Sequence, residues 1–441
     1  MLYILCLFLN FFAPADYATI EKRPEFINVF ESDIYSTYLN QRDAFLMLHT
    51  QAIAQMANEP HCKDLHDLLT CKGERGAVYQ IKFMNALREA LRKKEKASPS
   101  VQLFLDNFSV WLFGGPQLES PIRKFINQEL HLSLDEVATH DPQKVFMDVH
   151  NVVMQEQKFI EDKKTGRTLQ PEDNLLYGEL PSYLFNMGPV EVIRTSNVAG
   201  DLIIDKHGKT LTAEMDPEFF NYIETLAKRN QQHLYVNLLS RKNWEFNKAT
   251  LIENLEYDPQ TSHGIIVISL DKEKESPFYV QTAPYDTLED TEAFKTIFIQ
   301  KLLEPNGAYY WSKKIDHEKW PSTLAALIDE VHHQYFNHAS SLDVESRKDF
   351  IELVYVKIIE KIAQELRPIR LNVTCKQAAD RGPSLYTLLF LYDRSKHGTL
   401  QPRDYAEALT FAFGPPLAFH DRASHVYRIS TLQTAANRLI R

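Results

Sequence analysis

Apolar residues recur every three or four positions through much of the first 165 residues, with polar residues between them. This spacing places the apolar side chains on one face of a helix, so it predicts a helical N-terminal region. The predicted helices are Ile34–Met56, Ala77–Lys94, Val101–Phe113 and Gln143–Asp162.

The pattern changes after residue 208, where short apolar or alternating runs predict strands between helices. The predicted strands are Leu234–Leu239, Gly264–Leu270 and Arg370–Thr374. Helical spacing recurs in Glu289–Leu303, Pro321–Phe336 and Ser346–Leu366. This alternation predicts an α/β fold with a central, mainly parallel sheet flanked by helices, and an α+β arrangement is the alternative.

Turn-forming residues separate the two patterns. Residues 166–208 contain the pairs Gln170-Pro171, Leu180-Pro181 and Gly188-Pro189. We therefore expect a helical domain over 19–165, a linker or irregular subdomain over 166–208, and a sheet-containing domain over 209–441.

The first eighteen residues, Met1 to Ala18, are largely apolar and end in small residues, but they lack a positively charged start. They predict either a secretory signal, which would place the protein outside its cell, or a hydrophobic first helix of a cytoplasmic protein. No later segment approaches the ~20 apolar residues of a membrane-spanning helix, so we expect no span after residue 18.

The overall charge limits the class of partner. The chain has 49 basic and 59 acidic residues, a formal net charge of -10, which argues against binding nucleic acid by phosphate neutralisation. An anionic ligand would need local positive charge. One such cluster, or else an ordinary basic helix face, lies near the C-terminus in His420, Arg422, His425, Arg428, Arg438 and Arg441.

Beyond the leader, the chain has three cysteines: Cys62, Cys71 and Cys375. In an oxidising compartment Cys62 and Cys71 would pair, whereas in a reducing one all three would be free. A zinc site built on this pair with His61 and His66 is disfavoured, because the two cysteines lack the usual two-residue spacing. We expect neither a metal nor a cofactor.

The segment around Cys375 carries the clearest chemical signal. Cys375 lies six residues before Arg381, at a predicted strand-to-helix junction. A helix start offers backbone N–H groups to an anion, and an arginine fork holds two phosphate oxygens. Such positive surroundings favour the thiolate, which is the nucleophilic form of cysteine. The pattern predicts a phosphate-binding loop with Cys375 as nucleophile, whereas a buried core thiol is the alternative.

These residues resemble the loop of the inositol polyphosphate 4-phosphatases and the related bacterial effector inositol phosphate phosphatases. That loop reads Cys-Lys-Ser-(Ala or Gly)-Lys-Asp-Arg-(Thr or Ser), and the residues that match it are Cys375, Lys376, Ala378, Asp380 and Arg381. The resemblance implies a cysteine-phosphatase-like domain over 209–441, a nucleophile at Cys375 and a phosphate clamp at Arg381. Lys376 would contact a neighbouring ring phosphate. The other expected substrate-binding positions of the loop are Gln377, Ala378, Ala379, Gly382 and Ser384.

Two positions depart from the family pattern. Ala379 replaces a second lysine, so one cationic contact to a polyphosphorylated head group is lost. Gly382 replaces the hydroxyl residue after the arginine, so a donor that helps the thiolate leave the phosphoenzyme is lost. Ser384 is the nearest substitute for that hydroxyl.

Hydrolysis also needs an acid to protonate the departing alkoxide. Asp380 is one candidate, since several lipid phosphatases carry an aspartate at this place. Asp286 and Asp290 are others, in a polar segment after a predicted strand, although an acidic turn before a helix is commonly a cap.

Three functions follow. The first is a phosphate monoester hydrolase that forms a phosphocysteine and acts on phosphoinositides or inositol phosphates, with peripheral membrane contact and, if exported, an effector role. Thr374, where tyrosine phosphatases have histidine, favours these substrates. The second is a pseudophosphatase that binds phosphorylated ligands. The third is a hydrolase that pairs Cys375 with a distant histidine, of which the candidates are His263, His420 and His425.

Overall fold

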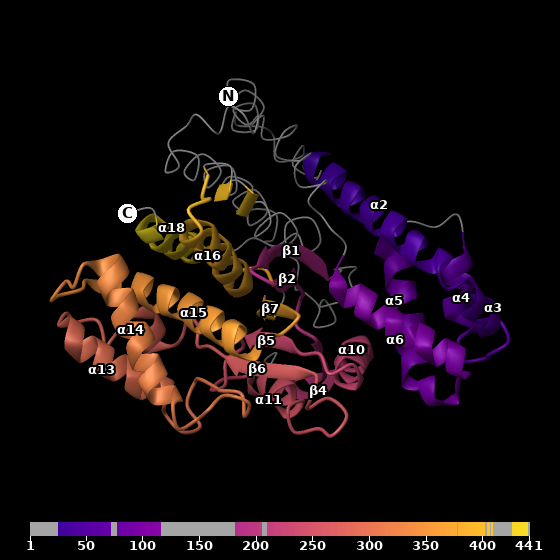
Figure 1. Ribbon diagram of the computed structural model, residues 1–441, viewed down its shortest axis with the longest axis horizontal. Coiled ribbons are helices and arrows are strands. Elements are labelled where there is room, and N and C mark those ends of the chain that lie inside the picture. The colour runs from indigo at the N-terminus through magenta and orange to yellow at the C-terminus, as the bar shows by residue number, and fades with distance from the viewer. Residues whose placement is uncertain are drawn as a thin grey trace.

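The computed structural model describes residues 25–71, 77–115, 181–204, 210–376, 378–401, 404–405, 407–408 and 426–439. A five-stranded sheet of order β1-β2-β7-β5-β6 lies at its centre (Figure 1). Strands β2, β7, β5 and β6 are parallel, and β1 is an antiparallel edge strand. The prediction of an α/β fold with a mainly parallel sheet is confirmed. The strands are β1 (Ser182–Met187), β2 (Val190–Arg194), β5 (His233–Asn237), β6 (Ile265–Ser269) and β7 (Arg370–Thr374).

Both faces of the sheet are buried, because alternate side chains of each strand enter two different cores. Leu234 and Val236 of β5 pack with apolar residues of the helices that follow β6 along the chain. Tyr235 between them packs instead with the N-terminal helices, α10 (Pro217–Lys228) and α11 (Phe246–Asn254). The helices of the first core are α12 (Pro277–Val280), α13 (Thr291–Leu302), α14 (Trp320–Phe336), α15 (Val344–Leu366), α16 (Arg381–Lys396) and α18 (Val426–Leu439).

The N-terminal helices gather on one side of the molecule, next to α10 (Figure 1). They are α2 (Glu25–Met47), α3 (Thr50–Met56), α4 (Lys63–Thr70), α5 (Ala77–Arg92), the short η2 (Lys94–Lys96) and α6 (Pro99–Gly114). A buried ion pair ties them to α10 (Pro217–Lys228), since Arg88 Nη2 lies 2.6 Å from Glu218 Oε1. The predicted helix Ile34–Met56 is divided between α2 and α3, and the predicted helix Gln143–Asp162 lies outside the described residues.

The segment predicted as a linker is in part a component of the sheet. Gly188 and Pro189, which suggested a break, form the turn of the β1–β2 hairpin, and Gly188 has the positive φ of 56° that such turns require. The linker prediction is therefore wrong for these strands. A separate hairpin follows, made of β3 (Ala199–Ile204) and β4 (Thr210–Met215), and it packs on α11 (Phe246–Asn254).

Of the two alternatives for Cys62 and Cys71, the structure supports free thiols and not a disulfide. Cys62 and Cys71 are both free and stand at opposite ends of α4. An eight-residue helix is about 12 Å long, and a disulfide needs Cα atoms within ~7 Å. The helix therefore keeps the two thiols apart. Among the described residues, no helix combines the length and apolar character needed to cross a bilayer.

Candidate functional site

The carboxyl ends of β2, β7, β5 and β6 meet at one edge of the sheet, where open α/β proteins commonly bind ligands. The segments that leave these ends bring together charged residues from distant parts of the sequence. They include Arg194 at the end of β2, Lys376, Asp380 and Arg381 after β7, Glu245 after β5 and Glu273 after β6. Cys375 therefore lies at the edge of the sheet where these charged residues gather.

Cys375 follows β7 directly and is 2% exposed. Its Sγ lies 3.6 Å from Oδ1 of Asp380, which precedes α16 as its N-cap residue. The same carboxylate oxygen accepts the backbone N–H of Arg381. Cysteine, aspartate and the first turn of α16 are therefore in direct contact, as the strand-loop-helix prediction required. Gln377 lies outside the described residues.

Arg381 is 8% exposed and is held by carboxylates. Its Nη1 and Nη2 lie 2.8 and 2.6 Å from the two Glu245 oxygens. Nη1 also donates to Glu273 Oε2 at 2.9 Å and to the Leu238 carbonyl at 2.9 Å. Burial by itself would lower the pKa of Arg381, but Glu245, with Cys375 and Asp380, raises it well above its usual value.

This arrangement leaves one edge of the guanidinium facing the loop. Glu245 binds the end of the fork that carries Nη1 and Nη2, whereas Nε lies 3.9 Å from Asp380 Oδ1. A guanidinium has five N–H donors, and its Nε side forms a second bidentate edge. That edge points toward the carboxylate that contacts Cys375.

Arg194, at the end of β2, also contacts the loop, and it was not among the predicted site residues. It is fully buried, and its Nη2 donates to the Ala378 carbonyl at 3.2 Å. Burial lowers the pKa of Arg194, and Tyr386 and Cys375 oppose this shift. Arg194 thus supports the loop backbone and places a second cation near Cys375. Sequence analysis missed it because it lies in the segment taken for a linker.

Lys376 is half-buried, with its Nζ 4.5 Å from the centre of the Trp244 ring. A cation over an aromatic face is stabilised by the ring quadrupole, so Trp244 helps to position this ammonium group. Ala378 has a positive φ of 45°, a conformation that L-residues seldom adopt, and Ala378 and Ala379 are both buried. The backbone therefore turns tightly at Ala378.

Gly382 lies in close packing between the start of α16 and β7. A Cβ at this position would lie 2.9 Å from the Val373 carbonyl oxygen and 3.4 Å from Thr374 Cα. The start of α16 approaches β7 too closely for a side chain. Ser384 does not supply the hydroxyl in this state, because its Oγ donates to the Arg381 carbonyl at 3.1 Å.

Two further cations lie near the loop. Lys272 donates to Glu352, and Arg428 of α18 donates to the Lys272 carbonyl and to Tyr279 Oη, the latter at 2.7 Å. Burial lowers the pKa of Lys272 to about 8, and Glu352 and Asp380 oppose the shift. Of the predicted C-terminal basic cluster, Arg428 thus lies near the site. Arg438 pairs instead with Asp349 at 3.2 Å, and Arg422, His420, His425 and Arg441 lie outside the described residues.

The other proposed acids have structural contacts of their own. Asp290 caps α13, accepting the Ala293 N–H at 2.7 Å. Asp286 is exposed, and its carbonyl accepts from Arg347 Nη2 at 3.0 Å. Of the three proposed acids, Asp380 is the one whose hydrogen bonds reach Cys375.

His263 lies at the opposite edge of the sheet from Cys375. It precedes β6, whereas Cys375 follows β7, and these strands run in the same direction on either side of β5. At about 3.3 Å per residue, the length of the strands places His263 roughly 20 Å from Cys375. His263 is therefore excluded as a partner of Cys375 in this structure.

The chain matches no family model, no curated protein and no solved structure. The resemblance of the loop therefore rests on its residues alone.

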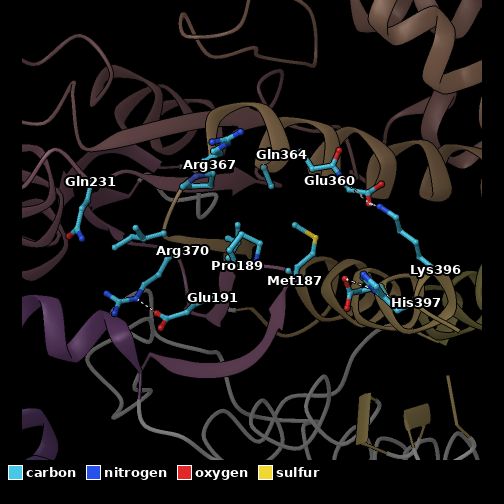
Figure 2. A pocket seen from close by; sticks show the side chains of 16 residues that line it. Met187, Pro189, Glu191, Gln231, Glu360, Gln364, Arg367, Arg370, Lys396 and His397 are labelled. Carbon is cyan, nitrogen blue, oxygen red and sulfur yellow. Dashed lines mark hydrogen bonds and ion pairs between the residues drawn. The ribbon is translucent and has the colours of Figure 1, made fainter. Parts of the chain in front are cut away.

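A cleft of about 720 Å³ lies at the other edge of the sheet (Figure 2). It is bordered by Glu191 and Arg370, at the starts of β2 and β7, and by Lys396 at the end of α16. Its charges are largely paired with one another. Arg370 Nε lies 2.6 Å from Glu191 Oε2, and Lys396 pairs with Glu360. Neither Cys375 nor Arg381 lines this cleft.

Proposed function

We propose that this protein hydrolyses phosphate monoesters through a phosphocysteine intermediate, with phosphoinositides or inositol phosphates as substrates. One observation carries the proposal. The Cys375 thiol, the Asp380 carboxylate and the Nε edge of Arg381 converge in a single loop at the start of α16. The helix N-terminus and the guanidinium together form a site for a tetrahedral anion.

Asp380 would supply both the base and the acid. Cys375 Sγ is 3.6 Å from Asp380 Oδ1, so the thiol proton passes to this carboxylate when substrate binds. The resulting thiolate attacks phosphorus, the S–P bond forms and the P–O bond to the alcohol breaks. Asp380 then gives the proton to the leaving oxygen. In the second step water attacks phosphorus, Asp380 accepts its proton, and the S–P bond breaks to restore the thiolate.

The remaining residues orient these groups. Glu245 accepts hydrogen bonds from both Nη atoms of Arg381, and this contact leaves the Nε edge of the guanidinium directed toward the loop. Arg194 holds the loop backbone through the Ala378 carbonyl. Lys376 is half-buried over the Trp244 ring, and in this proposal its ammonium group would meet a second phosphate on an inositol ring. These contacts support a polyphosphorylated substrate over a phosphotyrosine peptide.

A second candidate function is a phosphate-binding module with little turnover. It is favoured by the packing at Gly382, which leaves no room for a hydroxyl side chain. The missing hydroxyl would slow release of the thiolate from a phosphocysteine. The contact of Glu273 with Arg381 at 2.9 Å does not distinguish the two functions, because it competes with an incoming phosphate in either one.

The decisive assay measures phosphate release from phosphoinositides, inositol phosphates and a phosphotyrosine peptide under reducing conditions. Intact protein is compared with Cys375→Ser and with Cys71→Ser, a matched control because Cys71 is an exposed thiol far from the loop. Release that Cys375→Ser abolishes and Cys71→Ser preserves supports the hydrolase. Binding without release, lost in Arg381→Ala, supports the binding module. Neither release nor binding contradicts both.

A further inference from the structure

A second cluster of reactive side chains lies in the N-terminal helices, at the turn between α3 and α4. Glu59, His61 and Cys62 each offer a ligand atom, and these atoms all lie within 4.8 Å of one another. Cys62 is fully buried, while the side chains of His61 and Glu59 are 13% and 15% exposed. The cluster is therefore enclosed but retains access to solvent.

Two of these atoms lack a hydrogen bond. Glu59 Oε2 and His61 Nε2 are buried without a hydrogen-bond partner among the described residues, and they lie 3.6 Å apart. A buried polar atom without a partner is costly, by roughly 1–3 kcal/mol. Two such atoms facing one another beside a thiol form an arrangement that a bound ion would complete.

The carboxylate of Glu59 is held in this orientation by hydrogen bonds to its other oxygen. Its other oxygen, Oε1, accepts the backbone N–H of Ser98 at 3.0 Å and the Ser98 hydroxyl at 2.6 Å. Ser98 is the N-cap residue of α6. Such outer hydrogen bonds are typical of ligands that must be held in place around an ion.

We propose that Glu59, His61 and Cys62 form a binding site for a divalent cation of the zinc class. A thiolate, an imidazole and a carboxylate together suit Zn²⁺ better than Mg²⁺ or Ca²⁺, which prefer oxygen ligands alone. Tetrahedral zinc needs ligand atoms roughly 3.3–3.7 Å apart. The present separations therefore require side-chain shifts of about 1 Å at most. Three protein ligands leave the fourth position for water or another donor.

This site differs from the zinc site that the sequence disfavoured. Cys71 stands at the far end of α4, and His66 Nδ1 is bonded to Asp67 at 3.0 Å, so neither takes part. Burial, with the nearby Glu59 carboxylate, raises the pKa of Cys62 to about 11. Coordination would displace the thiol proton to solvent.

The test uses tag-free full-length protein, stripped with a chelator and titrated with Zn²⁺ and Co²⁺. We expect one equivalent of zinc to bind with micromolar or tighter affinity, in competition with a chromogenic chelator. We expect Co²⁺ to give a thiolate-to-metal charge-transfer band. Cys62→Ser should remove that band, while Glu59→Gln and His61→Gln should weaken zinc binding at least about tenfold. Cys71→Ser and His66→Gln are matched controls and should leave both unchanged.

Other results would overturn the proposal. Absence of zinc binding to the folded intact protein would mean that His61 and Glu59 pair with each other and hold no ion. A charge-transfer band that survives Cys62→Ser, or that Cys71→Ser removes, would place the ion elsewhere. Glu59→Gln is nearly isosteric, and its thermal unfolding without metal shows whether a loss of binding reflects a loss of folding.

Discussion

The two edges of the central sheet differ, because the buried cysteine, aspartate and arginine lie at one edge and the open cleft lies at the other. At the carboxyl edge, Cys375, Asp380 and Arg381 are buried and engaged with one another. At the amino edge lies a cleft of about 720 Å³, whose charged side chains are mostly paired among themselves. A large cleft therefore does not by itself locate reactive groups. Strand direction does so here, because loops that leave parallel strands gather at the carboxyl edge.

The largest effect should come from replacing Arg381 at the carboxyl edge, and Arg370 at the amino edge provides the control. Arg381→Lys removes the bidentate edge that faces Asp380, so we expect kcat/KM for phosphate release to fall roughly a hundred- to a thousandfold. Arg370→Lys, at the cleft, keeps a cation beside Glu191 and should stay within about twofold of the intact protein. Steady-state kinetics of the two variants checks this prediction. Equal losses of kcat/KM in the two variants would contradict the assignment of the reactive site to the carboxyl edge.

A second prediction concerns the close packing beneath the loop. Gly382→Ala places a Cβ 2.9 Å from the Val373 carbonyl, so we expect the free energy of unfolding to fall by ~1–3 kcal/mol. Gly200→Ala is the control, since the nearest atom to a Cβ there is 4.0 Å away. Urea denaturation measures both. An unchanged stability in Gly382→Ala would show that α16 can retreat from β7, and that a hydroxyl residue would fit.

At the amino edge, His233 should make the free energy of unfolding depend on pH. His233 is fully buried beside Asn372, and burial lowers its pKa to about 3. Since the unfolded value is about 6.5, the neutral ring stabilises the fold fully above that pH. This stability is lost as the pH falls from 6.5 toward 3, by at most about 1.4 kcal/mol per pH unit. Denaturation at pH 7.5 and 5 should show the loss, and His233→Gln should reduce it. An identical pH dependence in His233→Gln would assign the loss to other groups.

The smallest effect should come from the competing carboxylate. Glu273 binds Arg381 at 2.9 Å, so Glu273→Gln should strengthen binding of inorganic phosphate a few-fold, on the order of 1 kcal/mol or less. Glu245→Gln should weaken it, because Glu245 orients the guanidinium. Calorimetric titration with phosphate compares the two variants. Weaker binding in both would mean that Glu273 also orients Arg381 and does not compete.

The sequence predicted the central strands and the strand-loop-helix around Cys375, because local periodicity and turn residues determine these elements. Arg194, Glu245 and Glu273 could not be predicted, since each reaches the loop from a different strand end. The hairpin β1–β2 was missed because Gly188-Pro189 is typical equally of a linker and of a tight turn. The alternation in β7 predicted its strand, but its polar side chains are buried too. Asn372 Nδ2 donates to Thr195 Oγ1 at 2.8 Å, and Thr374 donates to the Thr195 carbonyl at 2.7 Å.

The most direct test of the central claim is to look for the phosphocysteine itself. Intact protein is mixed with an inositol polyphosphate, quenched within milliseconds to seconds, digested and examined by mass spectrometry. The proposed mechanism predicts a phosphoryl group on Cys375, accumulating because Gly382 supplies no hydroxyl to aid its breakdown. The adduct should be absent in Cys375→Ser. Phosphate release that proceeds with Cys375 unmodified, or with the phosphoryl group on another residue, would contradict the claim.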